Sequence, residues 1–140
     1  MLNCIKNVFK LKKKHHGNHV FGDFIWNVDE NIDHDLFANT IFKIMEESIK
    51  RTTMTIVHKK LCILGDRDES PPGFTSIILI DESHVSAHCY SDRGWLALDV
   101  FTCGNTDPKP IMDFIETEIK KYYPSLVCTF NKNNKRFHYK

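Results

Sequence analysis

The chain of 140 residues lacks any long apolar run and carries almost no net charge. No stretch approaches the roughly 18 apolar residues that a membrane-spanning helix needs, and the N-terminus has no signal-peptide core. A formal net charge of +1 gives no general attraction to nucleic acid or to anionic membranes. We therefore expect a soluble, cytoplasmic protein without nucleic-acid or membrane partners.

Paired cysteines are also lacking. The five cysteines are an odd number, widely spaced, with no C-x-x-C motif and no matching histidine pair. This spacing argues against a disulfide framework and against a metal site, and it fits a reducing compartment. We expect Cys62, Cys89 and Cys128 to be small buried residues in strands. Cys103 differs, because it stands beside Gly104 where a strand ends and a loop begins.

The hydrophobic pattern predicts one domain over residues 17–140, preceded by a basic tail at residues 1–16. Apolar side chains recur at helical spacing over residues 35–51 and again after Asp107-Pro108, where the stripe is Ile111, Phe114, Ile115, Ile119 and Tyr122. Strands are expected at residues 19–26, 53–64, 77–80, 85–90, 95–101 and 126–130, with a basic tail from Asn131. This order predicts an α/β (α+β) two-layer sandwich, in which a mainly antiparallel sheet carries two helices on one face.

A polar break separates two of these strands. The apolar run at residues 77–80 is followed by Asp81-Glu82-Ser83-His84, and the next strand is expected to restart at Val85. Strand side chains alternate, so Val85, Ala87 and Cys89 should share one face, and Ser86, His88 and Tyr90 the other. If the strand at 95–101 lies alongside, His88 and Cys103 can both approach the break at Glu82-Ser83. Such a grouping indicates a site for chemistry.

The same residues resemble a known family. Glu82-Ser83-His84, His88 and the run Asp99-Val100-Phe101-Thr102-Cys103-Gly104 are similar to the core of the small prokaryotic S-adenosylmethionine decarboxylases, which are pyruvoyl-dependent enzymes made as proenzymes. The similarity extends to Gly17–Phe24, which looks like the family's first strand. It also includes Pro71-x-Gly73 with the hydroxyl residues Thr75 and Ser76, which look like the family's approach to the cleavage site.

The resemblance implies that the chain cleaves itself. Ser83 Oγ would attack the Glu82 carbonyl and convert the peptide bond to an ester, and His88 would remove the Ser83 α-proton so that β-elimination breaks the ester. An imidazole suits this role, because its usual pKa of about 6.5 leaves a neutral base available near neutral pH. The products would be residues 1–82 and 83–140, with a pyruvoyl group derived from Ser83 as the cofactor.

The family also implies how that group is used. The ketone acts as an electrophile and electron sink for decarboxylation, and Cys103 returns a proton to the substrate α-carbon. A weaker role is expected for His84, for which an exposed or structural position is at least as reasonable. The active form would be a homodimer whose two sites draw residues from both subunits.

Substrate contacts are expected from Asp92, Glu69, Thr75 and Ser76. In the family, an acid at the position of Asp92 holds the ribose hydroxyls, and an aromatic residue ahead of Pro71 stacks on adenine. Glu69 and Ser70 occupy that second region here, and an acid cannot stack as a ring does, although it can pair with a cationic substrate. The rings of Phe21, Phe24 and Phe74 are the candidates to replace it.

Three alternatives to S-adenosylmethionine decarboxylation and spermidine synthesis stay open. The same machinery can decarboxylate a basic amino acid, arginine or ornithine, for which the acids at positions 68, 69 and 92 are suited. An inactive regulatory subunit is a second alternative, although it should have lost Ser83, His88 or Cys103, and all three are present. The last is a cysteine-histidine hydrolase that uses Cys103 and His88.

Overall fold

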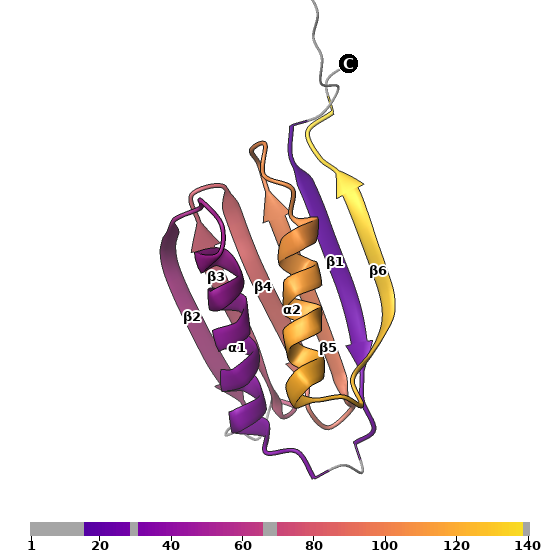
Figure 1. Ribbon diagram of the computed structural model, residues 1–140. Coiled ribbons are helices and arrows are strands. Elements are labelled where there is room, and N and C mark those ends of the chain that lie inside the picture. The colour runs from indigo at the N-terminus through magenta and orange to yellow at the C-terminus, as the bar shows by residue number, and fades with distance from the viewer. Residues whose placement is uncertain (1–15, 29–30, 66–69, 139–140) are drawn as a thin grey trace, which may run out of the picture.

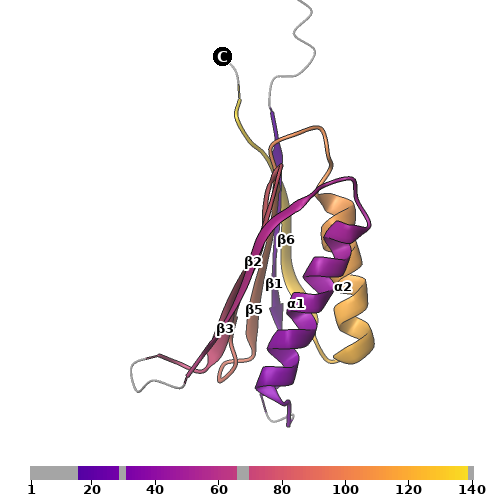
Figure 2. The same cartoon turned by 90° about the vertical axis from the view of Figure 1, so that its left-hand side faces the viewer.

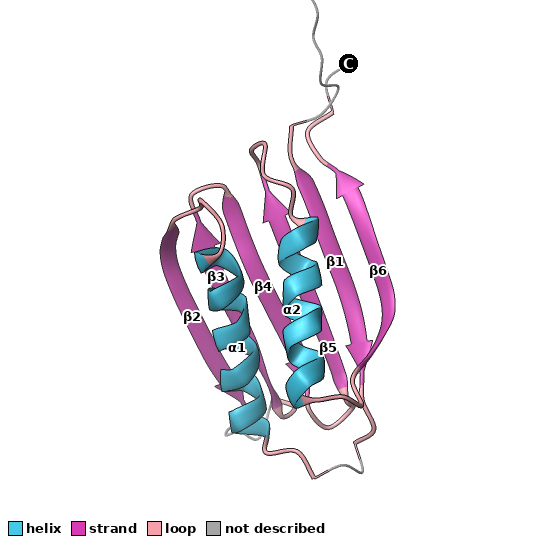
Figure 3. Cartoon of the chain, in the orientation of Figure 1, coloured by secondary structure: helices cyan, strands magenta, loops and turns pink. Residues whose placement is uncertain are grey.

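The computed structural model describes residues 16–28, 31–65 and 70–138. Our expectations for the tail before residue 16 and for Asp68 and Glu69 lie outside these residues. The elements follow in the order β1 (Asn18–Ile25), α1 (His34–Lys50), β2 (Ile56–Leu64), β3 (Gly73–Ile80), β4 (Ser83–Tyr90), β5 (Trp95–Thr102), α2 (Lys109–Tyr122) and β6 (Val127–Lys135) (Figures 1 and 3). No helix within the described residues is long and apolar enough to cross a membrane.

Six strands form one sheet in the order β2-β3-β4-β5-β1-β6, and every neighbouring pair is antiparallel. Both helices lie side by side on the same face of this sheet (Figures 1 and 2). The predicted two-layer sandwich is therefore confirmed.

The core lies between the helices and the sheet because side chains alternate along each strand. Val85, Ala87 and Cys89 of β4 are buried beneath the helices, and every second residue of β3, β5 and β1 joins them. Phe37 of α1 is fully buried among Trp26, Phe74 and Tyr123. The helix-facing half of the alternation is thus apolar, as predicted.

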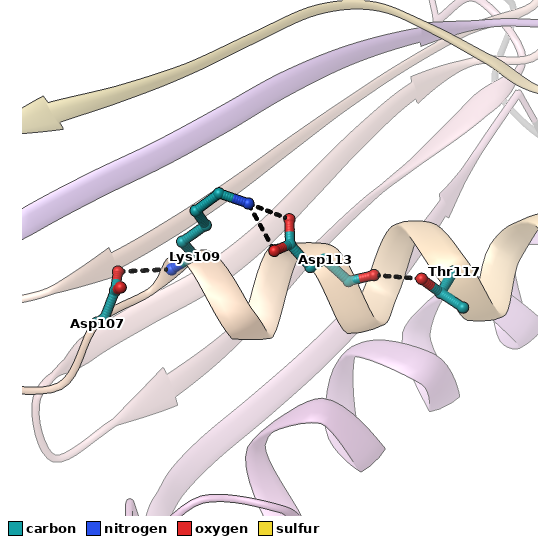
Figure 4. Close-up of polar contacts among 4 residues, drawn as sticks. All are labelled: Asp107, Lys109, Asp113 and Thr117. Carbon is teal, nitrogen blue, oxygen red and sulfur yellow. Dashed lines mark hydrogen bonds and ion pairs between the residues drawn. The ribbon is translucent and has the colours of Figure 1, made fainter.

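Local hydrogen bonds fix where the helices begin. The Asp33 carboxylate accepts a hydrogen bond from the backbone N–H of Leu36, which caps α1. At α2 the Asp107 carboxylate accepts from the backbone N–H of Lys109 at 3.0 Å (Figure 4). In the first turns that follow, the Lys109 ammonium pairs with Asp113, whose backbone carbonyl accepts from the Thr117 hydroxyl (Figure 4).

Several sequence predictions about strand ends and burial were wrong; β3 begins at Gly73 and β4 at Ser83, and Cys128 is only partly buried. The last strand does not end at Phe130 but continues to Lys135, because β6 stays hydrogen-bonded to β1 through the polar run that we had read as a tail. The buried stripe of α2 includes Met112, whereas Tyr122 is 63% exposed at the last turn. Cys62 is exposed, because β2 is an edge strand and this residue lies on the face without helices.

That second face, which we call the open face, carries no helix (Figure 2), and Arg136 and Phe137, which follow β6, contact the ring of Phe101 on it. It carries His88 and Tyr90 of β4, together with the partly exposed apolar side chains of Trp95, Leu79 and Phe130. The polar half of the alternation therefore gathers where a ligand or a second copy can reach it.

The α2 stripe gives a test of the packing. Ile115→Ala should lower the free energy of unfolding by about 2–5 kcal/mol, because it leaves a cavity in a fully buried site. Tyr122→Ala on the same helix should change it by less than about 0.5 kcal/mol. Urea denaturation measures both, in a Ser83→Ala background that prevents the self-cleavage expected from the sequence. Equal effects would contradict the observed helix orientation.

Candidate functional site

The break at Glu82-Ser83 lies in the tight turn that joins β3 to β4. Ser83 is the first residue of β4 and pairs with Ile80 on one side and with Thr102, the last residue of β5, on the other. The backbone N–H of Cys103 donates a hydrogen bond to the Glu82 carbonyl oxygen at 2.7 Å. Cys103 therefore lies at the break, as the predicted pairing of these strands requires.

The backbone at Ser83 is strained. Its φ angle is 142°, in a region that residues with a Cβ rarely adopt. A conformation of this kind is unfavourable by roughly 1–3 kcal/mol and persists only where the surrounding structure holds it. Here the ladder to Thr102 and the bond from Cys103 hold it. Opening the Glu82–Ser83 peptide bond would release this strain.

The Glu82 side chain fits tightly beside the loop after β5. Its Oε2 atom is buried and has no hydrogen-bond partner among the described residues. A Cβ at position 104 would come within 2.4 Å of that oxygen, so Gly104 provides the space that the carboxylate occupies. A buried oxygen without a partner is unfavourable, and cleavage that frees the Glu82 end would relieve it.

His84 contacts the reacting residue directly. Its Nδ1 atom lies 3.2 Å from Ser83 Oγ, and its ring packs edge-on against Phe101 with 5.7 Å between centroids. Burial lowers the pKa of His84, and the nearby His19 lowers it further. Asp99 opposes this effect, and it also pairs with His19 at 2.8 Å.

His88 lies elsewhere on the same strand. It pairs with Thr75 on β3 and Ala97 on β5, and its Nδ1 atom is 2.7 Å from Thr75 Oγ1. Five residues separate it from Ser83, or about 16 Å along a strand. The expectation that His88 and Cys103 meet at the break is therefore wrong for a single chain. The same separation argues against a hydrolase built from Cys103 and His88 of one chain.

The predicted substrate residues divide between the two faces. Thr75 is exposed on the open face beside His88, and Asp92 is exposed in the turn after β4. Ser76 is only 1% exposed and points under the helices, where its hydroxyl contacts Met45 Sδ at 3.6 Å. This orientation excludes Ser76 from a site on the open face. Glu69 lies outside the described residues.

The rings proposed to replace the missing aromatic divide in the same way. Phe24 and Phe74 are each 1% exposed and belong to the core beneath the helices, so neither can stack on a ligand at the open face. Phe21 is half-buried on the open face, where it contacts the rings of His19 and Phe130.

The sequence analysis missed a pocket beside His88. A cavity of about 340 Å³ is lined by His88, Tyr90 and Trp95 together with the carboxylate-bearing Asp23 of β1. The guanidinium of Arg93 lies over both the Tyr90 and Trp95 rings, at 5.8 and 5.2 Å from their centroids. Strand alternation could have placed the two rings on one face, but the neighbouring β1 was needed to complete the pocket.

Comparison with known proteins gives the family. A model of the S-adenosylmethionine decarboxylase family matches residues 18–126. The S-adenosylmethionine decarboxylase proenzyme of Pyrococcus horikoshii is 35% identical over 96 residues, which cover 68% of this chain and 64% of that protein. The proenzyme of Brevibacillus brevis is 34% identical over 105 residues, 74% of this chain and 73% of that one.

Coverage of the relatives varies. A proenzyme from Thermococcus onnurineus is 44% identical, but the match covers only 39% of either chain. This match and the one to the Pyrococcus horikoshii protein span less than two thirds of the relatives' own lengths. The crystal structure of the adenosylmethionine decarboxylase from Aquifex aeolicus has the same fold, with a TM-score of 0.65 at 23% identity over 91% of this chain and 96% of that one. From the family match and these relatives, the chain belongs to the S-adenosylmethionine decarboxylase family.

Proposed function

We propose that this chain is a proenzyme that cleaves itself between Glu82 and Ser83 and then decarboxylates S-adenosylmethionine, supplying the aminopropyl donor for spermidine synthesis. The observation that carries the proposal is the strained Ser83 whose preceding carbonyl accepts the Cys103 N–H, in a chain of this family. A backbone donor on that carbonyl stabilises the negative charge that develops there when a nucleophile adds.

The residues around Ser83 fit a pyruvoyl group formed from it. Such a group supplies an electrophilic ketone and an electron sink for loss of carbon dioxide. Cys103, a free and half-buried thiol next to the break, is in reach to hold and return a proton at the substrate α-carbon. The buried Glu82 carboxylate occupies the space beside Gly104, and this space would become free once the two ends separate.

A second copy of the chain could bring a His88 to Ser83, although the two residues lie far apart within one chain. In a two-fold symmetric dimer, a contact of residue i with residue j is repeated as j with i. A two-fold axis that lies parallel to the sheet, just in front of the open face and across the middle of β4, would bring His88 of each copy toward Ser83 of the other. The dimer would also cover the exposed apolar side chains of that face. We therefore propose a homodimer with two shared sites.

The pocket beside His88 would then lie next to the Ser83 of the other copy. Tyr90 and Trp95 offer flat rings for a purine, and the carboxylates of Asp23 and Asp92 can accept hydrogen bonds from ribose hydroxyls. In this arrangement the two rings take the part of the aromatic residue missing ahead of Pro71. A basic amino acid has no purine ring to stack there, so the pocket favours the nucleoside substrate.

The first test is direct. Freshly purified chain should separate by mass into residues 1–82 and 83–140, and should release carbon dioxide from S-adenosylmethionine but not from arginine, ornithine or lysine. Ser83→Ala removes the nucleophile, so it should stay intact and inactive, whereas Ser86→Ala, a serine on the same strand, should still be cleaved. Activity from uncleaved chain would refute the proposal. Release of carbon dioxide from arginine or ornithine alone would show that the substrate is a basic amino acid instead.

Mixed dimers test the shared site. Ser83→Ala and His88→Ala should each fail to mature alone, the first for want of the nucleophile and the second for want of the base. Co-expressed with different tags, they form dimers in which the Ser83 of the second chain faces the His88 of the first. Mass spectrometry should then find only the His88→Ala chain cleaved. If neither chain is cleaved in the mixture, His88 does not act across the dimer.

The pocket gives a prediction on affinity. Trp95→Ala should raise the KM for S-adenosylmethionine about tenfold, because stacking on a base contributes roughly 1–3 kcal/mol. Trp95→Phe keeps a ring and should stay close to the parent. Steady-state kinetics, scaled to the amount of cleaved chain, measure both variants. An unchanged KM in Trp95→Ala would exclude this pocket as the site of the base.

A further inference from the structure

We propose that His84 is the general base that starts self-cleavage within its own chain, by taking the proton of the Ser83 hydroxyl as its oxygen attacks the Glu82 carbonyl carbon. The inference rests on the proposed self-cleavage and assigns a step for which His88 of the same chain is too far away. It gives His84 a part in the chemistry where its sequence position alone had indicated an exposed or structural residue.

The contact is already formed in the folded chain. His84 Nδ1 and Ser83 Oγ are 3.2 Å apart, within the reach expected of a general base. The edge-on packing of the imidazole against Phe101 holds the ring in this orientation. Ser83 and His84 are consecutive, and residues that follow one another in a strand normally point to opposite faces. The unusual φ of Ser83 is what breaks that alternation here.

Other bases in the same chain are engaged or distant. His88 lies about 16 Å along the strand and its Nδ1 contacts Thr75. His19 uses Nε2 to pair with Asp99 at 2.8 Å. Among the described histidines, His84 is thus the one with a ring nitrogen against the nucleophile.

The surroundings favour the neutral form of His84. Its half-buried ring has a lowered pKa, first through burial and then through His19 on β1; Asp99 on β5 acts the other way, and Arg136 after β6 lowers the pKa again. An imidazole is a base only above its pKa. A lowered pKa therefore keeps it competent at neutral pH and extends that competence to more acidic solutions.

The step balances without any other reactant. Nδ1 takes the hydroxyl proton while Ser83 Oγ bonds to the Glu82 carbonyl carbon, and the N–H of Cys103 stabilises the oxygen that becomes negative. The carbon–nitrogen bond then breaks, and the imidazolium returns the proton to the departing Ser83 nitrogen. The product is an ester with a free amine, and His84 is neutral again.

The test follows freshly translated or refolded chain over time. His84→Ala and His84→Asn should be cleaved at least about 100-fold more slowly, within the range of general-base contributions. Asn offers a hydrogen-bonding group near the position of Nδ1 but no base, so it separates catalysis from positioning. His34→Ala, at an exposed histidine that begins α1, should be cleaved at the parent rate.

Hydroxylamine locates the step, because it splits esters but not peptide bonds. His88→Ala should accumulate the ester and be split at position 82 by hydroxylamine, whereas His84→Asn should remain intact. Added imidazole should restore part of the cleavage in His84→Ala, which also shows that this variant folds. In the parent chain, the cleavage rate should fall with acid around a midpoint below pH 6.5.

Different failures have different meanings. Parent-like cleavage of His84→Asn, or hydroxylamine-sensitive ester in that variant, would overturn the role of His84 while leaving self-cleavage intact. A parent chain that is never cleaved, or a Ser83→Ala chain that is, would instead overturn the proposed function on which the inference rests.

Discussion

The register between β4 and β5 is the constraint on which the site depends. It aligns Ser83 with Thr102, so that the next residue, Cys103, can donate its N–H to the Glu82 carbonyl. The same alignment holds Ser83 in its strained backbone conformation. A shift of one residue would turn every side chain of β4 to the opposite face, bringing His84 and His88 under the helices and Val85 into solvent. The buried face of the strand thus keeps the reactive turn in place.

The two faces of the sheet divide the work of the molecule. The helix side is filled with apolar residues and contributes stability, whereas the open face carries histidines, carboxylates and rings. This division accounts for an apparent conflict in one short strand. In the proposed function, Ser83 and His88 take part in the same reaction although they lie toward opposite ends of β4, because the open face of one chain would be completed by a second copy.

Much of this could be predicted from the sequence. Period-two alternation gave the sides of Val85 and His88, and polar residues after an apolar run marked the turn at Glu82. Chemistry that depends on distance could not be predicted. Ser83 and His88 are close together in the sequence motif, but an extended strand separates them by about 3.3 Å per residue. Only the fold revealed that separation.

Other errors have local causes. Ser76 and Phe74 lie on the helix side of the sheet because side chains alternate along β3 and the register with β4 fixes which positions face the helices. The hydroxyl or aromatic character of these residues does not decide their side. The end of β6 is held by pairing with β1, which compensates for the weak strand preference of its asparagines and lysines. The φ angle of Ser83 could not be predicted from the sequence, because serine has no particular preference for a positive φ.

The strand order has a bearing on what would happen after scission. Residues 1–82 would keep β1, β2 and β3, and residues 83–140 would keep β4, β5 and β6, yet β1 sits between β5 and β6. The two pieces would interleave, joined along β3–β4, β5–β1 and β1–β6, with α1 of one lying against α2 of the other. Parting them would mean dismantling most of the sheet. The cleaved chain can therefore stay folded as one unit, with its two new ends held next to each other by the sheet.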